Sequence, residues 1–176
     1  MAQARRAVRA PAKAGARLFP VAACLAIATA SAADVTFTTK SLTPEAALKA
    51  AQAALAKCRA DGFQVAVVVV DRSGLPQVLL RDRFAGPHTV EVATNKAWSA
   101  VSFRTDTSEL ERASRPGTAM SGLRHFPRAT TVGGGQRIEG GGSLVGGIGV
   151  SGAPGGDADD ACAAAGIKAI ADDLEF

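Results

Sequence analysis

The sequence predicts an α+β domain in which two β-hairpins form an antiparallel sheet and helices pack against it. The first hairpin is indicated by residues 64–71, an apolar β-branched run without alternation, followed by a tight turn at 71–74 and a partner strand at 78–81. The second joins residues 136–139 to residues 143–150 through three glycines. Because tight turns join antiparallel neighbours, the sheet is expected to be antiparallel, with the apolar first strand at its centre.

A first helix is expected between Pro44 and Gly62. Thr43 can cap its amino end, and proline at the first helical position gives up no useful donor. Its apolar stripe recurs at helical spacing, at Leu48, Ala51, Leu55 and Cys58. The small side chains of this face favour close packing on the sheet.

Two further helices are expected, at residues 88–101 and at residues 157–173. Residues 102–128 are polar and mixed, and they are expected to form loops with a short helix near 108–113. The last strand before the final helix is rich in glycine, so it would admit a helix or a ligand close to its backbone.

Residues 1–33 have the pattern of a secretory signal peptide. Five basic residues precede an uncharged apolar stretch at 18–30, and small residues at 30–33 offer a cleavage site. This stretch is too short for a permanent membrane span. We therefore expect a periplasmic or secreted domain, residues 34–176, with no membrane insertion after the signal is cleaved.

Removal of this segment changes the charge balance. The chain has 20 basic and 16 acidic residues, but 5 of the basic ones and none of the acidic ones lie before Asp34. The domain therefore carries 15 basic and 16 acidic residues. No basic stripe remains to neutralise phosphates, so nucleic acid is not an expected partner.

Cys58 and Cys162 are the two cysteines after residue 33. In an oxidising compartment an even number favours a disulfide, which would close a loop of roughly 100 residues and stabilise the fold by about 4 kcal/mol. The alternative is a pair of buried reduced thiols.

Residues 147–152, Gly-Ile-Gly-Val-Ser-Gly, match the dinucleotide-binding pattern G-x-G-x-x-G. That fold needs a further parallel strand after the glycines, with an acidic ligand for the ribose. Only 24 residues follow Gly152, and they predict one helix and no strand. We interpret the match as a coincidence within a glycine-rich strand.

Several motifs, in order, resemble the GlcG/HbpS-like family of haem-binding-protein relatives. They are residues 68–74 (Val-Val-Val-Asp-Arg-Ser-Gly), Arg81 with residues 84–86 (Phe-Ala-Gly), Ala93, Lys96-Ala97, Ala100, Gly134-Gly135, residues 147–152 and Asp157. The resemblance extends from about residue 42 to residue 170. The chain departs from the family at one point, because many members have an acidic residue where this chain has Arg83.

The resemblance implies a single profilin-like domain with a five-stranded antiparallel sheet in a three-layer α/β/α arrangement. It also implies homo-oligomers and, for some members, haem binding. One member is a secreted haem-binding partner of a membrane sensor kinase, and a related domain ends a corrinoid adenosyltransferase. Haem is therefore the expected cofactor, and a membrane-bound sensor or transport protein is an expected partner.

His88 and His125 are the only histidines, and imidazole is the usual protein ligand of haem iron. His88 opens a helix beside the loop that holds Phe84; the alternative role is that of an ordinary helix-start residue. His125 lies on an expected loop, where a surface role is the alternative. Met120 could supply a weaker sulfur donor instead.

Arginine could bind the haem propionates, since guanidinium binds carboxylate through two hydrogen bonds. The candidates are Arg81, Arg83, Arg104, Arg124 and Arg137, each with a solvated surface role as the alternative.

Lys96 could bind an anionic ligand or pair with Asp71, which is itself expected to cap its turn. A buried ion pair is the role of Lys96 that we favour. The haem-binding residues expected from these arguments are His88, Arg81, Phe84, Lys96 and His125, with His88 on the iron.

The sequence has no zinc-ligand spacing, G-x-S-x-G elbow or Walker loop, so we assign no catalytic residue and an enzyme is the less favoured interpretation. Three functions remain open. The first is an exported haem- or tetrapyrrole-binding protein in haem sequestration or redox sensing. The second is a small-metabolite-binding protein or enzyme that uses the glycine-rich strand, Lys96 and arginines around a subunit-interface pocket. The third is a non-catalytic oligomeric regulatory protein.

Overall fold

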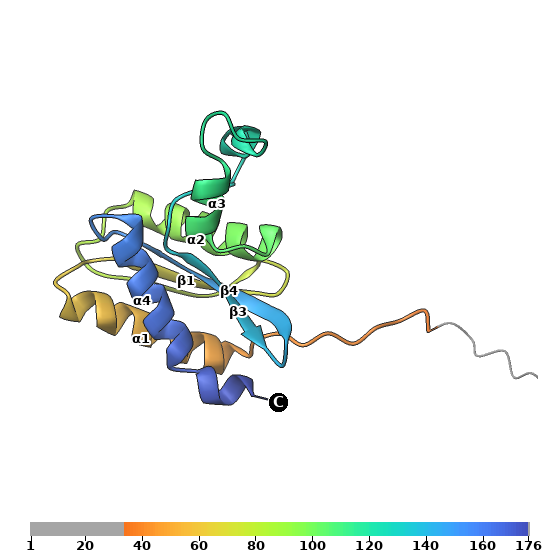
Figure 1. Cartoon of the computed structure of the whole chain (residues 1–176). Helices are drawn as coiled ribbons and strands as arrows, with labels where there is room; N and C mark the ends of the chain where they lie inside the picture. The colour runs from red at the N-terminus through yellow and green to blue at the C-terminus, as the bar shows by residue number, and fades with distance from the viewer. Residues whose placement is uncertain (1–33, 176) are drawn as a thin grey trace, which may run out of the picture. The chain divides into compact units, whose positions relative to one another are not determined.

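The computed structural model describes residues 34–175, and the helices and strands described here lie in the compact unit from Thr38 onward (Figure 1). In chain order they are α1 Pro44–Ala60, β1 Ala66–Asp71, β2 Pro76–Arg81, α2 His88–Phe103, α3 Thr107–Ala113, the 3-10 helix η1 Ser121–His125, β3 Gly135–Gly140, β4 Ser143–Ser151, α4 Gly156–Lys168 and the 3-10 helix η2 Ala171–Leu174. The predicted α+β class is confirmed. The segment predicted as a signal peptide lies outside the described residues.

The strands form an antiparallel sheet in the order β2-β1-β4-β3. The predicted central position of β1 is confirmed, because β1 pairs with β2 on one side and with β4 on the other. The predicted turn after β1 is also confirmed: Asp71 Oδ1 accepts hydrogen bonds from the N–H groups of Ser73 at 2.8 Å and Leu75 at 2.9 Å.

The five-stranded sheet that the resemblance implied is wrong for the described residues, which contain four strands. Segment 38–43 contributes a backbone hydrogen bond to the sheet, from Leu42 N–H to Val145 O at 3.1 Å, but Thr43 and Pro44 already start α1. Segment 114–134 consists of turns and η1. Its glycines and prolines disfavour a strand.

Helices cover both faces of the sheet, so the predicted three layers are confirmed (Figure 1). α1 and α4 lie on one face, over a core that includes Val67 and Ile148. α2 lies on the other face, against Val68 and Val70. The alternation along β1 separates the two cores, because successive side chains of a strand point to opposite faces.

The glycine-rich β4 allows α2 to approach the sheet. A Cβ atom at Gly149 would lie 2.0 Å from Ala93 O and 2.7 Å from Ala97 N, so no side chain fits at that position. The glycine-rich strand was predicted to admit either a helix or a ligand close to its backbone. In the structure, the helix α2 lies there.

α1 begins as predicted, with Thr43 Oγ1 accepting from Ala46 N–H at 3.2 Å. Its predicted apolar stripe is correct except at Leu48, which is 40% exposed. Alanines form most of the buried face instead, at positions 47, 50, 51 and 54. The helix needs small residues because α4 packs closely on it: a Cβ at Gly166 would lie 2.7 Å from Ala50 O.

The final helix ends earlier than predicted. α4 stops at Lys168, and the 3-10 helix η2 replaces the rest of the expected helix. The tighter turn buries Ile170 completely, and Leu174 O accepts a hydrogen bond from Gly141 N–H at 3.2 Å, in the β3–β4 turn. Among residues 34–175, no helix is long and apolar enough to cross a membrane.

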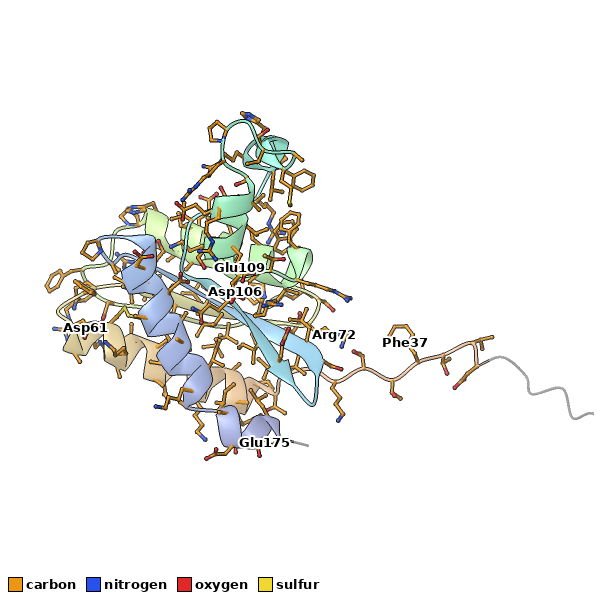
Figure 2. All side chains as sticks on the ribbon, viewed as in Figure 1. Phe37, Asp61, Arg72, Asp106, Glu109 and Glu175 are labelled. Carbon is orange, nitrogen blue, oxygen red and sulfur yellow. A yellow bond between two sulfur atoms is a disulfide. The ribbon has the colours of Figure 1, made fainter. Side chains whose placement is uncertain are left out.

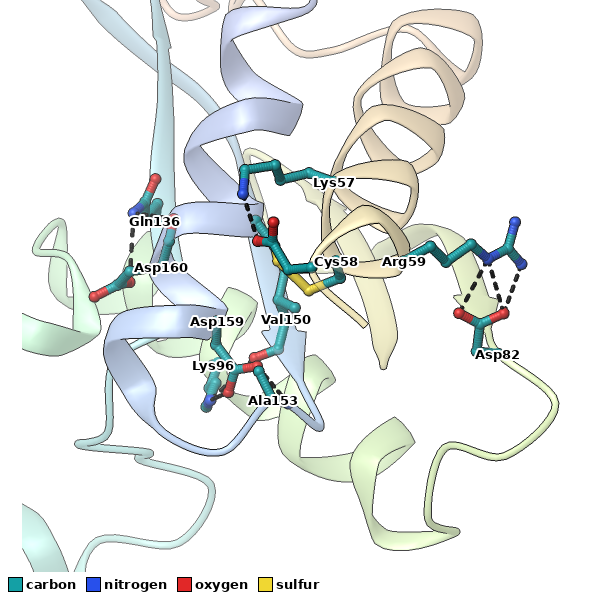
Figure 3. Close-up of a disulfide and its surroundings, with 12 residues drawn as sticks. Lys57, Cys58, Arg59, Asp82, Lys96, Gln136, Val150, Ala153, Asp159 and Asp160 are labelled. Carbon is teal, nitrogen blue, oxygen red and sulfur yellow. Dashed lines mark hydrogen bonds and ion pairs between the residues drawn. A yellow bond between two sulfur atoms is a disulfide. The ribbon is translucent and has the colours of Figure 1, made fainter. Parts of the chain in front are cut away.

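A disulfide joins Cys58 of α1 to Cys162 of α4, which confirms the predicted bridge (Figure 3). Both cysteines are fully buried, and their Cα atoms are 5.5 Å apart. The bridge links positions separated by 104 residues, so it removes much of the conformational freedom of the unfolded chain.

Candidate functional site

The loop between β2 and α2, residues 82–87, is fixed by a buried carboxylate. Asp82 is 3% exposed, and its carboxylate accepts hydrogen bonds from Arg59 of α1, from Nε at 3.0 and 3.1 Å and from Nη2 at 2.6 Å (Figure 3). The Asp82 N–H donates to Val65 O at 2.9 Å. The hydrogen bond with Asp82 raises the pKa of Arg59 above its usual value.

Arg81 holds the same loop from the side of β2. Its guanidinium donates to Ala85 O, and Ala85 N–H donates to Asp82 O at 3.1 Å. One of the donors of this predicted carboxylate-binding residue is therefore engaged within the loop.

Phe84 of this loop and His88, the residue that follows it, both expose their rings to solvent. His88 is the first residue of α2, is exposed, and has no hydrogen-bond or ion-pair partner among residues 34–175. Its ring lies against the backbone of Gly86: a Cβ there would be 2.7 Å from Cε1 and 2.9 Å from Nδ1, but 3.8 Å from Nε2. Phe84 is 79% exposed. The loop and the residue that follows it thus offer an aromatic face and an imidazole nitrogen.

A cleft of about 410 Å³ lies at the loop, lined by Arg59, Gln64, Asp82, Arg83 and Phe84. This volume is in the range of small-molecule sites, about 300–1,000 Å³. Arg59 is paired with Asp82, whereas Arg83 is exposed and has no ion-pair partner among the described residues. Arg83 is therefore the cation of this cleft that can meet a carboxylate.

Lys96 lies at neither the loop nor a surface cleft. It is 2% exposed, and its Nζ donates to Asp159 Oδ2 at 2.7 Å and to Val150 O at 3.0 Å (Figure 3). The favoured buried ion pair is confirmed, but the partner is Asp159 and not Asp71. The predicted role of Lys96 in ligand binding is not supported by this position, since its amine is directed at protein oxygens.

The buried ion pair belongs to a larger polar group. Burial raises the pKa of Asp159 above its usual value, and the attraction of Lys96 opposes this shift without cancelling it. Asp159 Oδ1 accepts from Ala153 N–H at 3.1 Å, and the neighbouring Asp160 accepts from Gly134 N–H at 2.6 Å. These contacts tie α2 and α4 to the glycine segment before β3.

Residues 112–128, called the flap below, comprise the last two residues of α3 and the segment that projects beyond it, which contains η1 (Figure 1). A hollow of about 470 Å³ in the flap is lined by Pro116, Gly117, Ser121, Gly122, Arg124 and His125. His125 is exposed and has no hydrogen-bond or ion-pair partner among residues 34–175. Met120 is 45% exposed and Phe126 is 56% exposed.

Aromatic rings join the flap to α2. Phe126 packs edge-on to Phe103 with ring centroids 6.4 Å apart, and Phe103 packs in the same way on Trp98 at 6.1 Å. The guanidinium of Arg128 lies over the Trp98 ring, 4.6 Å from its centroid.

The two histidines lie at opposite ends of α2. The helix starts at His88 and ends at Phe103, which the flap contacts through Phe126. Fifteen residues of helix correspond to a rise of about 22 Å. One chain therefore cannot bring both imidazoles to the same iron, and the predicted site divides into two candidate sites.

Two of the remaining predicted arginines, Arg124 and Arg137, are engaged in contacts within the protein. Arg124 donates to Ser114 O at 2.7 Å and to Glu111 O at 3.1 Å, and Arg137 pairs with Asp106 at 3.1 Å. These contacts hold the flap and β3 and leave less of either guanidinium for a ligand.

Two features were not predicted. The Arg59–Asp82 ion pair joins residues that are 23 positions apart on separate elements, so no local sequence pattern predicts it. A third hollow, of about 370 Å³, lies between the start of α1 and η2, and the Lys49–Asp173 ion pair is in its lining. Among the described residues, no group of three or more His, Cys, Asp or Glu side chains could hold a metal ion.

Comparison with known proteins identifies the family. A family model described as haem degrading protein HbpS-like matches residues 42–168. The chain belongs to this HbpS-like family. The resemblance inferred from the motifs is therefore confirmed.

Solved structures of HbpS-like proteins are similar over most of the chain. A double mutant of Streptomyces reticuli HbpS is 38% identical with a TM-score of 0.71, covering 90% of this chain and 97% of that one. PduOC, crystallised as a complex with heme, is 32% identical with a TM-score of 0.70, covering 74% and 95%. Klebsiella pneumoniae protein ORFY is 28% identical with a TM-score of 0.77, covering 80% and 98%.

Curated relatives are matched over shorter stretches. The corrinoid adenosyltransferase PduO of Citrobacter freundii is 42% identical over 98 residues, which are 53% of this chain and 29% of that protein. The match thus spans less than a third of that enzyme. An uncharacterized 15.0 kDa protein from the dhaT-dhaS intergenic region of Citrobacter freundii is 34% identical over 113 residues, 63% of this chain and 80% of that protein.

Proposed function

We propose that the domain from Asp34 onward is an exported haem- or tetrapyrrole-binding protein. The observation that carries this proposal is the similarity to PduOC, at 32% identity, because PduOC was crystallised with heme. Export is proposed from the signal-peptide pattern of residues 1–33, which places the domain in the periplasm or outside the cell.

The residues of the β2–α2 loop fit a haem. Such a site needs a donor for the iron, an aromatic or apolar face, and cations for the propionates. Phe84 offers an exposed ring and Arg83 an unpaired guanidinium, and both line a cleft of about 410 Å³. His88, the residue that follows the loop, offers an imidazole without a protein partner among the described residues. Haem, when bound, supplies a redox-active iron; the residues of this chain bind and orient it. His88 is the residue that would bind the haem iron.

The flap is the second candidate site. His125 lines its hollow of about 470 Å³, and Met120 and Phe126 expose apolar surface nearby in the sequence. We favour the loop because its backbone is fixed by Arg59 and Asp82, and a fixed loop loses less conformational entropy on binding.

The small-metabolite alternative has less support. It depended on the glycine-rich strand and on Lys96, but α2 covers that strand and Lys96 is buried against Asp159. Arg83 at the cleft is what still favours it. A homo-oligomer that acts with a membrane-bound sensor or transport protein, in haem sequestration or redox sensing, is compatible with the haem proposal and belongs with it as a hypothesis.

A hemin titration of the chain from Asp34 onward tests the proposal. We expect a saturable shift of the Soret band, and an increase of the melting temperature that grows with hemin concentration, since a ligand of the native state stabilises it. A featureless, non-saturating rise in absorbance without a change in melting temperature would contradict haem binding.

The family description also names haem degradation. The same complex, incubated with ascorbate under air, gives the test of that activity. A loss of the Soret band that is faster than in free hemin would extend the proposed function to degradation, and a stable band would limit it to binding.

A further inference from the structure

The flap differs in charge from the rest of the chain. Its four charged residues are all arginines, Arg112, Arg115, Arg124 and Arg128, and all four are exposed. The remainder of the chain from Asp34 onward has 11 basic and 16 acidic residues, a net charge of −5. A positively charged segment therefore projects from a negatively charged body.

Large apolar side chains accompany this charge. Met120 and Phe126 are 45% and 56% exposed within the flap. The acidic residues before it in sequence lie at the start of α3 or within it: Glu111 directly precedes Arg112, and Figure 2 shows two others, Asp106 and Glu109, at the base of the flap. Beyond α3, residues 114–128 combine three arginines with exposed apolar surface and have no carboxylate.

The shape of the flap limits what it can dock onto. Figures 1 and 2 show a narrow segment that stands out from the layer formed by α2. A protein interface of standard size buries about 800 Å² on each partner and requires a broad surface. A bilayer has no such requirement, because a narrow tip can enter between the head groups to whatever depth its apolar side chains favour.

We propose that the flap docks the domain onto an anionic lipid bilayer. Met120 and Phe126 enter the head-group region, and Arg112 and Arg115 bind lipid phosphates, for which guanidinium is well suited. The negative body is repelled by the same surface, so the end of the molecule with the flap faces the membrane. This docking does not depend on haem binding.

Vesicle sedimentation tests the proposal. The chain from Asp34 onward is the right protein, since both cores and the disulfide lie within it and the apolar stretch at 18–30 would itself bind lipid. We expect binding to vesicles of phosphatidylglycerol mixed with phosphatidylcholine, and none to phosphatidylcholine alone. High salt should abolish the binding, because it screens the arginines.

Two sets of variants locate the contact. Arg112→Ala with Arg115→Ala should lower the partition coefficient about fivefold per arginine. Met120→Ser and Phe126→Ser should each lower it on the order of tenfold. Matched controls elsewhere on the surface, Lys168→Ala and Leu75→Ser, should leave binding unchanged; Leu75 is 64% exposed. Trp98 is the only tryptophan, so its emission reports whether each variant keeps the aromatic contacts of the flap.

Three results would overturn the proposal. The first is equal binding to anionic and neutral vesicles, and the second is binding that the flap variants do not reduce. The third is retention on immobilised poly-L-glutamate, with the same dependence on Arg112 and Arg115, in the absence of vesicle binding. That third result would assign the flap to an acidic protein surface instead.

Discussion

The two ends of α2 are held in place in different ways. At the His88 end, the β2–α2 loop is fixed by the hydrogen bonds between Asp82 and Arg59. Arg59 directly follows Cys58, so the loop is connected through one residue to the buried disulfide. At the other end, the flap is joined to α2 by ring contacts, by Arg128 over Trp98 and by one hydrogen bond from Ser99 Oγ to Arg128 O at 3.4 Å.

This difference suggests a division of roles. A loop pinned by buried hydrogen bonds keeps its exposed side chains in one arrangement, which favours binding of a rigid planar ligand. A projecting segment with few buried contacts opens more easily and adapts to a deformable surface. This difference is consistent with our proposals of a ligand at the His88 end and a docking surface at the flap.

The largest expected effect comes from the buried ion pair in the middle of α2, between the two ends. Lys96→Ala leaves the buried carboxylate of Asp159 without its cation, and we expect the free energy of unfolding to fall by about 3–5 kcal/mol. Urea denaturation measures this loss. Replacing both partners, by Lys96→Met with Asp159→Leu, should recover part of it; a double variant less stable than the single one would contradict a cost due to the unpaired charge.

The stability of Lys96→Ala should also depend on pH. Burial raises the pKa of Asp159 in the folded protein, and removal of Lys96 raises it further. A carboxyl whose pKa is higher when folded stabilises the fold below the unfolded pKa, near 3.9, and this contribution is lost as the pH rises through the folded pKa. The deficit of the variant relative to the wild type should therefore grow with pH above about 4. A deficit that shrinks as pH rises would show that the carboxyl does not carry the effect.

Loss of the disulfide is expected to affect the two ends of α2 to different extents. Cys58→Ser with Cys162→Ser should lower the free energy of unfolding by about 2–5 kcal/mol. Because Arg59 follows Cys58, amide hydrogen exchange should increase in the β2–α2 loop more than in the flap. Equal increases at both ends would mean that the disulfide does not act locally on the loop.

A pair of glycine variants compares the two histidines directly. At Gly86 a Cβ would lie 2.7 Å from His88 Cε1, so Gly86→Ala must displace the imidazole; we expect hemin affinity to fall about tenfold with little change in stability. Gly122, in the flap near His125, has nothing within 4 Å of such a Cβ, and Gly122→Ala is the control that should keep full affinity. Isothermal titration with hemin measures both, and equal losses would contradict a site at His88.

The smallest effect is expected from Arg128→Ala, which removes the contact over Trp98. The loss of stability should be about 0.5–1 kcal/mol, as for other exposed cation–π pairs. The emission of Trp98 should change at the same time, because the charge above its ring is lost. Unchanged emission would mean that Arg128 does not lie over the ring in solution.

The sequence predicted those parts of the fold that are determined by residues close together in the chain. Both hairpins, the cap at Thr43 and the turn at Asp71 follow from local patterns, and the family motifs added the three layers. The partner of Lys96 could not be predicted, since Asp159 is 63 residues away and reaches it only when α4 packs beside β4. The end of α4 was missed because the demand to bury Ile170 overrides helix propensity.

The positions of the two candidate sites also depend on contacts between residues that are distant in sequence. Sequence could nominate the histidines by residue type, but their placement at opposite ends of one helix depends on where the flap returns to Phe103. The pinned loop depends on Arg59, which lies on a different helix from His88.

A hemin titration of His88→Ala beside His125→Ala shows which of the two histidines binds haem. We expect His88→Ala to lose the saturable Soret shift and His125→Ala to keep the affinity and spectrum of the wild type. A shift lost in His125→Ala and retained in His88→Ala would contradict this expectation and assign the haem to the flap.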